Sequence, residues 1–253
     1  MMNNVSIASP KTLTFRSFTN WVSNHWFDIF LYIFGLWVII PWFAPVMMKL
    51  GWTSAGNGIY FMYSFFCHQL PQRSIFLFGE QNMYPLSEIQ SVWQNTSNPL
   101  ILRQFTGNTS IGWKVAWSDR MISFYTSVWV FAVIFFWLRN KIKPISLWIA
   151  LLLLLPIILD GGTHMISDFS GIGNGFRDSN AWLAQLTNNS FPQNFYSGDG
   201  IGSFNSWARW ITGTLAGFAI IWLALPNIFE IQILNKKLDE LSIENVFRQN
   251  TIQ

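Results

Sequence analysis

MISFYTSVWVFAVIFFWL, residues 121–138, is an unbroken apolar stretch, and it decides the fold class of this chain. A helix needs roughly 20 apolar residues to cross about 30 Å of bilayer hydrocarbon. Three further stretches approach that length, at residues 27–48, 145 to about 165, and 207 to about 229. Apolar residues occupy every face of each stretch, as expected of helices surrounded by lipid and by one another. The sequence therefore predicts an integral membrane protein with four spans.

The composition supports this prediction and excludes other classes. Of the 253 residues, 51% are hydrophobic and only 11% are charged, whereas soluble domains carry about a quarter charged residues. The net charge of +3 does not indicate a nucleic-acid partner, because the fifteen Lys and Arg are scattered and form no basic stripe. A single cysteine, Cys67, excludes an intrachain disulfide. Membrane lipids are the partners that the composition predicts.

The loop LRNKIKP, residues 138–144, predicts the orientation. Arg139, Lys141 and Lys143 lie within it, and short loops rich in Lys and Arg are typically cytoplasmic. Both termini then lie in the cytoplasm, and the bundle is integral to the cell membrane. Residues 1–26 form a cytoplasmic segment, residues 27–229 the transmembrane bundle, and residues 230–253 a cytoplasmic amphipathic helical tail. The first span lacks a small-residue cleavage site, so we expect it to stay in the mature protein.

A shorter apolar piece, Gly58 to Cys67, lies between the first two spans and is followed by the polar letters HQLPQR. Ten residues are too few to cross a bilayer, so this piece predicts a re-entrant or broken helix. Two long polar stretches, residues 80–112 and 167–206, are expected to be ordered extracytoplasmic loops. The predicted fold class is all-α: a polytopic transmembrane helical bundle with about four spans, the broken segment and two long external loops.

Polar groups gather near the outer ends of these spans. Ionisable residues at membrane depth are costly, so they normally face the bundle interior, pair, and mark a site. We therefore interpret FFCHQLPQRS, residues 65–74, as one wall of an outward-facing polar pocket. Arginine forks suit phosphate or carboxylate groups. Guanidinium groups outnumber carboxylates among the candidates, which are Arg73, Arg120, Arg177 and Arg209 against Asp119 and Asp160.

Two other interpretations of these groups stay open. Each charge near a helix end could reach the interface or close a structural salt bridge, for instance Asp119 with Arg209. Asp160 and His164, four residues apart on a helix, could join His68 in a two-histidine, one-carboxylate metal site. Against this, Gly161 and Gly162 could end the helix and destroy the spacing. No metal is therefore assigned, and the cofactor is left unknown.

Five segments in order resemble the signature segments of an uncharacterised bacterial and archaeal membrane family, domain of unknown function 2085. They are CHQLPQRS, SDRMISFYTSVW, LPIILDGGTH, RDSNAW and WARWITGTLAG, which together cover Cys67 to Gly217. The resemblance implies a small polytopic helical bundle and no known activity. This chain departs from the family pattern at several positions. Gln72 stands where the family has Glu, and His164 stands where it has Gln. Met121, and either Trp117 or Ser118, stand where the family has cysteines. The positions that the resemblance implicates are Cys67, His68, Gln69, Arg73, Ser74, Arg120, Tyr125, Asp160, Gly161, Thr163, Arg177, Ser179, Asn180, Arg209, Thr212 and Gly213.

The leading hypothesis is a membrane enzyme that acts on an anionic lipid headgroup or an isoprenoid phosphate. Arg120, Arg177 and Arg209 would neutralise the anion. His68, with Asp160 orienting it or acting as a second acid or base, would move protons. The predicted substrate-binding residues are Cys67, Gln69, Arg73, Asp119, Tyr125, Thr163, His164, Arg177, Asn180 and Thr212. The alternatives are a binding or transport protein gated by the broken segment, or an accessory subunit of a membrane complex. A homo-oligomer also stays open.

Overall fold

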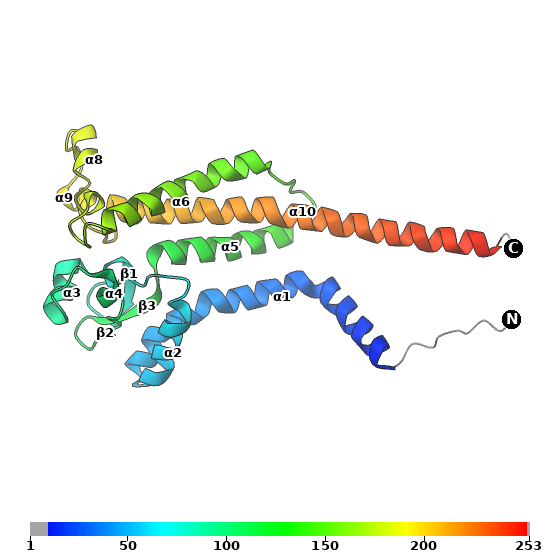
Figure 1. Cartoon of the computed structure of the whole chain (residues 1–253), viewed down its shortest axis with the longest axis horizontal. Coiled ribbons are helices and arrows are strands. Elements are labelled where there is room, and N and C mark those ends of the chain that lie inside the picture. The colour runs from blue at the N-terminus through cyan, green and yellow to red at the C-terminus, as the bar shows by residue number, and fades with distance from the viewer. Residues whose placement is uncertain (1–9, 252–253) are drawn as a thin grey trace.

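Four long helices run side by side through the molecule, which was analysed as a computed structural model that describes residues 10–251 (Figure 1). Each helix contains a stretch long and apolar enough to cross a membrane: Trp21–Lys49, Asp119–Leu138, Leu147–Asp168 and Phe204–Leu238. The predicted four-span, mostly helical fold is therefore confirmed. The helices are α1 (Pro10–Lys49), α5 (Asp119–Leu138), α6 (Leu147–Asp168) and α10 (Phe204–Thr251).

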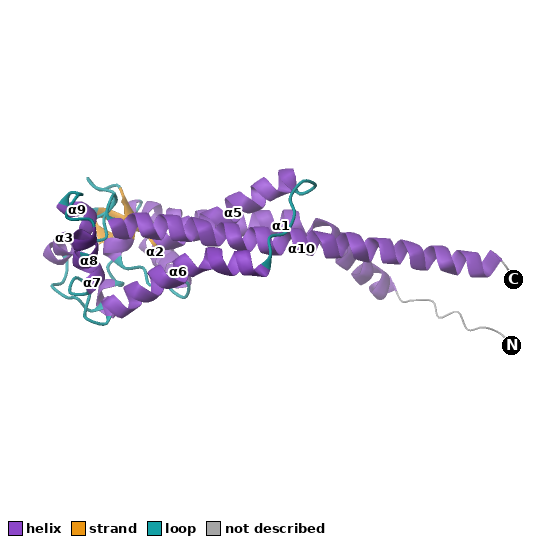
Figure 2. Cartoon of the chain, turned by 90° about the horizontal axis from the view of Figure 1, so that it is seen from above, coloured by secondary structure: helices purple, strands orange, loops and turns teal. Residues whose placement is uncertain are grey.

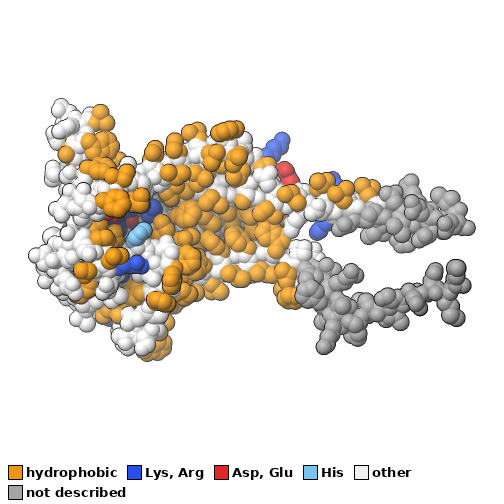
Figure 3. Space-filling model, viewed as in Figure 1, with side chains coloured by type: hydrophobic (Ala, Val, Ile, Leu, Met, Phe, Trp, Pro, Cys, Tyr) orange, Lys and Arg blue, Asp and Glu red, His pale blue; other side chains and the backbone are white. Residues whose placement is uncertain are grey.

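An apolar surface covers the middle of the bundle, as Figure 3 shows. Large apolar side chains of α5 and α6 are exposed, for example Trp137, Trp148 and Leu152, which are between 67% and 80% accessible. Such a surface is stable against lipid chains and costly against water. Which end of the bundle faces the cytoplasm stays a prediction from the basic loop after α5.

The bundle ends at one side in a folded cap, which we define as residues 50–118 and 169–203 (Figure 2). We call this side the cap end, and the side at which α5 finishes the tail end. Besides helices, the cap holds a small antiparallel sheet in the order β1-β3-β2. Its elements are α2 (Thr53–Tyr63), the 3-10 turn η1 (Pro71–Arg73), β1 (Ser74–Leu77), α3 (Leu86–Val92), α4 (Pro99–Leu102), β2 (Gly107–Asn108), β3 (Gly112–Ser118), α7 (Phe176–Ser179), α8 (Ala181–Leu186) and α9 (Gln193–Tyr196).

The predicted broken helix corresponds to α2 and the irregular residues 64–70 that follow it. The sheet was not expected from the sequence. Its longest strand, β3, has the sequence GWKVAWS, in which Lys114 interrupts the apolar residues, and it follows a long polar stretch. Every residue of β3 except Ser118 is buried. The cap is thus an ordered domain with its own apolar core, in agreement with the expected ordered caps.

Helices α5 and α10 form the tightest contact of the bundle. Gly213 and Gly217 of α10 face Ser123 and Ser127 of α5, and a Cβ at either glycine would overlap the opposing serine Oγ. Ser123 Oγ donates a hydrogen bond to the carbonyl oxygen of Arg209 at 3.1 Å. Small residues at such positions let helix backbones approach closely in membranes. This contact sets the separation of the charged residues at the cap end.

The last helix extends beyond its membrane-spanning part. The chain after residue 229 was predicted to form an amphipathic helical tail, and in the structure it is a helical continuation of α10 that reaches Thr251. Figure 1 shows this part of α10 extending away from the other helices. Similarly, α6 passes through Gly161 and Gly162 and ends only at Asp168, so the two glycines do not break the spacing of Asp160 and His164.

Candidate functional site

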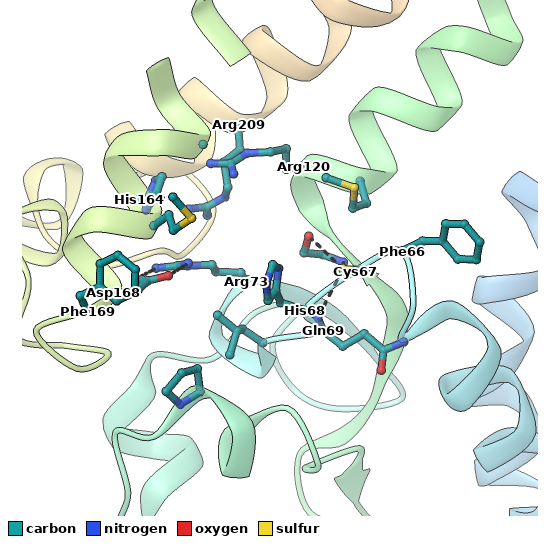
Figure 4. Close-up of a pocket in the computed structure, with 16 residues that line it drawn as sticks. Phe66, Cys67, His68, Gln69, Arg73, Arg120, His164, Asp168, Phe169 and Arg209 are labelled. Atoms are coloured by element: carbon teal, nitrogen blue, oxygen red, sulfur yellow. Dashed lines mark hydrogen bonds and ion pairs between the residues drawn. The ribbon is translucent and has the colours of Figure 1, made fainter. Parts of the chain in front are cut away.

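A cavity of about 420 Å³ lies at the cap end, between residues 66–73 and the adjoining ends of α5, α6 and α10 (Figure 4). Its polar lining comes from both the bundle and the cap. Its apolar lining includes Phe66, Met121, Met165 and Phe169. The polar side chains that line it are Cys67, His68, Gln69, Arg73, Ser118, Arg120, His164, Asp168 and Arg209.

Arg209 lies at the centre of the charged network on one side of this cavity. Its Nε donates to both carboxylate oxygens of Asp119, at 2.7 and 2.8 Å. Its Nη1 and Nη2 donate to the carboxylate and the backbone carbonyl of Asp199, at 2.6 and 2.7 Å. One guanidinium therefore joins the start of α5, the start of α10 and the cap loop that precedes α10.

Arg73 connects the same cap loop to α6. It donates to both carboxylate oxygens of Asp168 at 2.7 and 2.8 Å, and its Nε donates to Asp199 at 2.9 Å. Burial alone would raise the pKa of the Asp199 carboxyl, but Arg73 and Arg209 outweigh it and hold that pKa well below its usual range. Asp199 is therefore ionised at neutral pH.

Asp160 of α6 holds a second part of the network. One carboxylate oxygen accepts from Arg120 Nη2 at 2.7 Å, and the other accepts from Arg177 Nη2 at 2.8 Å. His164, one turn further along α6, has its Nε2 3.7 Å from the same carboxylate. Nε2 of His164 is also 3.2 Å from Arg177 Nη2, which can only donate. The hydrogen-bond pattern therefore assigns the proton of a neutral ring to Nδ1 of His164, a buried atom with no partner among the described residues.

The predicted guanidinium surplus does not hold for the network as a whole. Four arginines meet four aspartates, because Asp168 and Asp199 join the two carboxylates expected from the sequence. Sequence reasoning missed both. Asp168 continues the four-residue spacing of Asp160 and His164 along one face of α6, a signal that could have been read. Asp199, in the glycine-rich turn GDGIG, carries no such signal.

The charges are nevertheless unevenly distributed around the cavity. Three arginines and one aspartate line it, a formal excess of two positive charges: Arg73, Arg120 and Arg209 against Asp168. The other three aspartates bind these arginines from behind. Arg120 is the least engaged of the three. Within the described residues its guanidinium bonds only through Nη2, and its buried Nε has no partner.

The opposite wall is held in place from inside the cap. Cys67 Sγ accepts hydrogen bonds from the backbone N–H groups of Gln69 and Ser118, both at 3.3 Å. Gln69 has a positive φ of 53°, a conformation that costs most residues about 1–2 kcal/mol. Its side-chain amide donates to the carbonyl oxygens of Tyr60 and Ala116, both at 2.9 Å. These contacts present Cys67, His68 and Gln69 to the cavity, as Figure 4 shows.

Lys114 of β3 completes this support and was not predicted from the sequence. Its Nζ donates to the carbonyl oxygens of Gln69 and Arg103, at 2.6 and 2.8 Å. No carboxylate pairs with it among the described residues. Burial therefore lowers the pKa of Lys114 to about 7.

Seven of the predicted site residues line the cavity, and two more support it from behind. Asp119 and Asp160 do not line it but bind arginines that do. The predicted pairing of His68 with Asp160 is wrong, because Asp160 contacts Arg120, Arg177 and His164 instead. The seven are Cys67, His68, Gln69, Arg73, Arg120, His164 and Arg209.

The remaining predicted residues lie away from the cavity lining. Tyr125 stacks on Trp117, with ring centroids 4.5 Å apart, and is a packing residue. Thr163 accepts from Arg177 Nη1 at 2.9 Å, and both line a separate, shallower pocket. Asn180 is buried and donates to the carbonyl oxygens of Arg177 and Tyr196, at 2.7 and 2.8 Å. Thr212 is buried in α10 with no hydrogen-bond partner for Oγ1 among the described residues.

The metal alternative gains no support from the geometry. His68 is exposed and forms no hydrogen bond or ion pair with Asp160 or His164 in the described part of the chain, whereas the metal site would require all three side chains together. Within residues 10–251, no three His, Cys, Asp or Glu side chains form a group that could hold a metal ion.

Residues 109–223 match the family described as "Predicted membrane protein (DUF2085)". The predicted resemblance is confirmed over that part, which contains Arg120, Asp160, Arg177 and Arg209. The segment CHQLPQRS lies outside the matched residues.

A relative is similar to this chain over a longer part of its length. "Uncharacterized protein MJ1492" from Methanocaldococcus jannaschii is 25% identical over 210 residues, which is 80% of this chain and 92% of the relative. No solved structure matches the chain.

Proposed function

We propose that the cavity at the cap end opens to the outside of the cell and binds the anionic headgroup of a membrane amphiphile, a lipid or an isoprenoid phosphate. The protein would act on this headgroup as a membrane enzyme. The charge and the boundary position of the cavity both favour such a ligand.

The unfilled hydrogen-bonding capacity of Arg120 carries the proposal. Buried polar groups are nearly always hydrogen-bonded, and a buried guanidinium nitrogen without an acceptor is costly. Nε of Arg120 is such an atom, and Nη1 of the same guanidinium also makes no hydrogen bond to the described residues but is not fully buried. A phosphate or carboxylate oxygen in the cavity would supply an acceptor for Nη1. It would also balance the positive excess of the lining.

The apolar lining favours an amphiphile over a soluble anion. Phe66 and Phe169 line the cavity and are 51% and 81% exposed. Met121 and Met165 line it next to the arginines. The cavity therefore combines a cationic floor with an apolar mouth, which matches a charged headgroup attached to a hydrocarbon chain.

Catalysis would use two rigidly held arginines, Arg73 and Arg209, and one exposed histidine, His68. Arg73 and Arg209 are fixed by two aspartates each, so their positive charges are preorganised. His68 lines the cavity, is exposed, and would move a proton to or from the bound headgroup. Because Asp160 does not orient His68, this proton transfer would rely on the ligand itself to position the ring.

The experiment compares Arg120 with Lys143, an exposed cation beyond the other end of α5 that does not line the cavity. Binding of farnesyl phosphate to the detergent-purified protein would be measured by isothermal titration calorimetry, with farnesol as the uncharged probe. We expect Arg120→Ala to weaken farnesyl phosphate binding at least about tenfold, because a charge-assisted hydrogen bond contributes roughly 1.5–3 kcal/mol. Lys143→Ala should leave it unchanged. Equal binding of farnesol and farnesyl phosphate, or equal affinity in the wild type and Arg120→Ala, would remove the anion site.

A further inference from the structure

A second cavity, of about 830 Å³, lies at the opposite end of the bundle from the proposed headgroup site. It is enclosed by residues 23–28 of α1, the end of α5, and residues 229–236 of α10. In Figure 1 the first part of α1 diverges from α10 at this end. The divergence opens a wedge between two helices at the edge of the apolar surface.

Two cations line this cavity without an ion-pair partner among the described residues: Arg139 and Lys236. Arg139 directly follows α5, and its guanidinium lies over the rings of Phe136 and Phe229, 5.1 and 5.7 Å from their centroids. Lys236 lies on α10 seven residues after Phe229, and thus on the same helix face. The rings hold the Arg139 guanidinium against the cavity wall.

The neutral lining adds donors that suit an anion. Asn24, Gln232 and Asn235 contribute side-chain amides, and Ser23 a hydroxyl. Asp28 is the one carboxylate among the lining residues, so two cations face a single negative charge. The cavity has a formal excess of one positive charge, which a phosphodiester would neutralise. This differs from the cap end, where aspartates occupy most of the arginine donors.

Two apolar grooves adjoin the polar cavity and share Trp26 with it. One groove, of about 490 Å³, follows α1 past Phe30, Ile33 and Phe34. The other, of about 420 Å³, runs between α1, α5 and α10 and is lined by Phe30, Phe34 and Leu225 among others. Both begin at the cavity and extend along α1 into the membrane-spanning part. A polar cavity with two apolar grooves leading from it is complementary in shape to an amphiphile that has one polar headgroup and two hydrocarbon chains.

We propose that this end of the bundle binds one anionic diacyl phospholipid, with its phosphodiester between Arg139 and Lys236 and its acyl chains in the two grooves along α1. The charge excess selects a singly negative headgroup over a zwitterionic one. The basic loop after α5 is the predicted cytoplasmic side, where such lipids attract Lys and Arg. This site does not depend on the proposed function of the cap-end cavity.

The experiment uses two double variants that remove the same charge. Arg139→Ala with Lys236→Ala deletes both lining cations, whereas Lys141→Ala with Lys143→Ala deletes two nearby cations that do not line the cavity. Retention of phosphatidylglycerol on the detergent-purified protein would be titrated by native mass spectrometry. We expect the first variant to weaken retention at least about tenfold and the second to leave it within about twofold. Equal losses in both variants would overturn the proposal, because only a diffuse surface charge would then be acting.

Two further arms identify the ligand chemistry and the site. Phosphatidylcholine should be retained several-fold more weakly than phosphatidylglycerol, and soluble glycerol phosphate should not compete. Competition by glycerol phosphate at the concentration of the lipid would overturn the lipid assignment. Lys49→Ala, which removes a cation at the cap end that lines neither cavity, should retain the lipid as the wild type does. A loss of lipid in Lys49→Ala would contradict the assignment of the site to the tail end.

Discussion

Arg209 and Asp119 form a fully buried ion pair, with side chains 1% and 0% exposed, that joins α10 to the first residue of α5. The pair lies where the two helices meet the cap, and Arg209 also binds Asp199 of the cap loop. Desolvation offsets much of the attraction within a buried ion pair, so an intact pair contributes little net stability. Removing one partner is nevertheless strongly destabilising, because the other charge is left buried without compensation. The pair therefore determines how the bundle and the cap are oriented around the cavity.

Asp119→Asn should lower the free energy of unfolding by about 3–5 kcal/mol, because it leaves the Arg209 charge uncompensated on that side. Denaturant unfolding in detergent micelles would measure this. The double variant Asp119→Asn with Arg209→Gln should lose less than the sum of the two single variants, because the two residues share one contact. Additive losses would show that the two side chains are not coupled.

Gly213→Ala should destabilise the bundle by about 1–3 kcal/mol, because its Cβ would overlap Ser123 Oγ and force α10 away from α5. Thermal unfolding in detergent would report the loss. Gly162→Ala is the matched control: it also lies within a spanning helix, and nothing stands within 4 Å of its Cβ position. That control should gain about 0.5–1 kcal/mol, the usual effect of Gly to Ala in a helix. Equal effects at the two positions would contradict the close contact.

Gln69→Ala should be less stable than Gln69→Gly, the reverse of the order expected for a helix. Both variants lose the hydrogen bonds to Tyr60 and Ala116, each contributing about 1 kcal/mol. Only glycine adopts the φ of 53° without strain, a difference of about 1–2 kcal/mol. Chemical denaturation of both variants would test the order. If Gln69→Ala were the more stable one, the left-handed conformation at this position would be refuted.

Stability should rise with pH between about 7 and about 10.5, because burial lowers the pKa of Lys114 from 10.5 to about 7. In this window the unfolded chain binds a proton that the folded protein does not, so unfolding becomes less favourable as pH rises. This gain in stability is complete above the Lys114 pKa in the unfolded chain, 10.5, and is lost as pH falls through its pKa in the folded protein, about 7. The slope approaches about 1.4 kcal/mol per pH unit.

Lys114→Met should remove this slope, and unfolding midpoints between pH 7.5 and 9.5 would measure the difference between wild type and variant. Lys143→Met, an exchange at the tail end of the bundle, is the control and should keep the wild-type slope. An unchanged slope in Lys114→Met would mean that another group titrates in this range.

The fold class was predictable because each span carries its own signal. A stretch such as residues 121–138 is apolar on every face, and lipid permits only helices or closed barrels for such segments. The cap sheet was not predictable in the same way. Its strand β3 buries Lys114, whose partners are backbone carbonyls contributed by residues 11 and 45 positions away.

The candidate site was predictable in membership more than in pairing. The cost of stray charge in lipid correctly indicated that Arg73, Arg120, Asp160 and Arg209 gather at one end of the bundle. It did not indicate that Asp199 would lie between Arg73 and Arg209, because the turn containing it gives no periodic signal. It also suggested His68 as the partner of Asp160, whereas the structure pairs that carboxylate with Arg120 and Arg177.

The amino-acid sequence was enough to predict four spanning helices and the gathering of Arg73, Arg120, Asp160 and Arg209 at one end of them. Both follow from the solvent, since hydrocarbon excludes unpaired polar groups wherever they occur along the chain. Which aspartate pairs with which arginine, and that Arg120 has fewer hydrogen bonds than the other arginines of the network, could be seen only in the folded structure. Those pairings depend on contacts between segments up to 126 residues apart, as between Arg73 and Asp199.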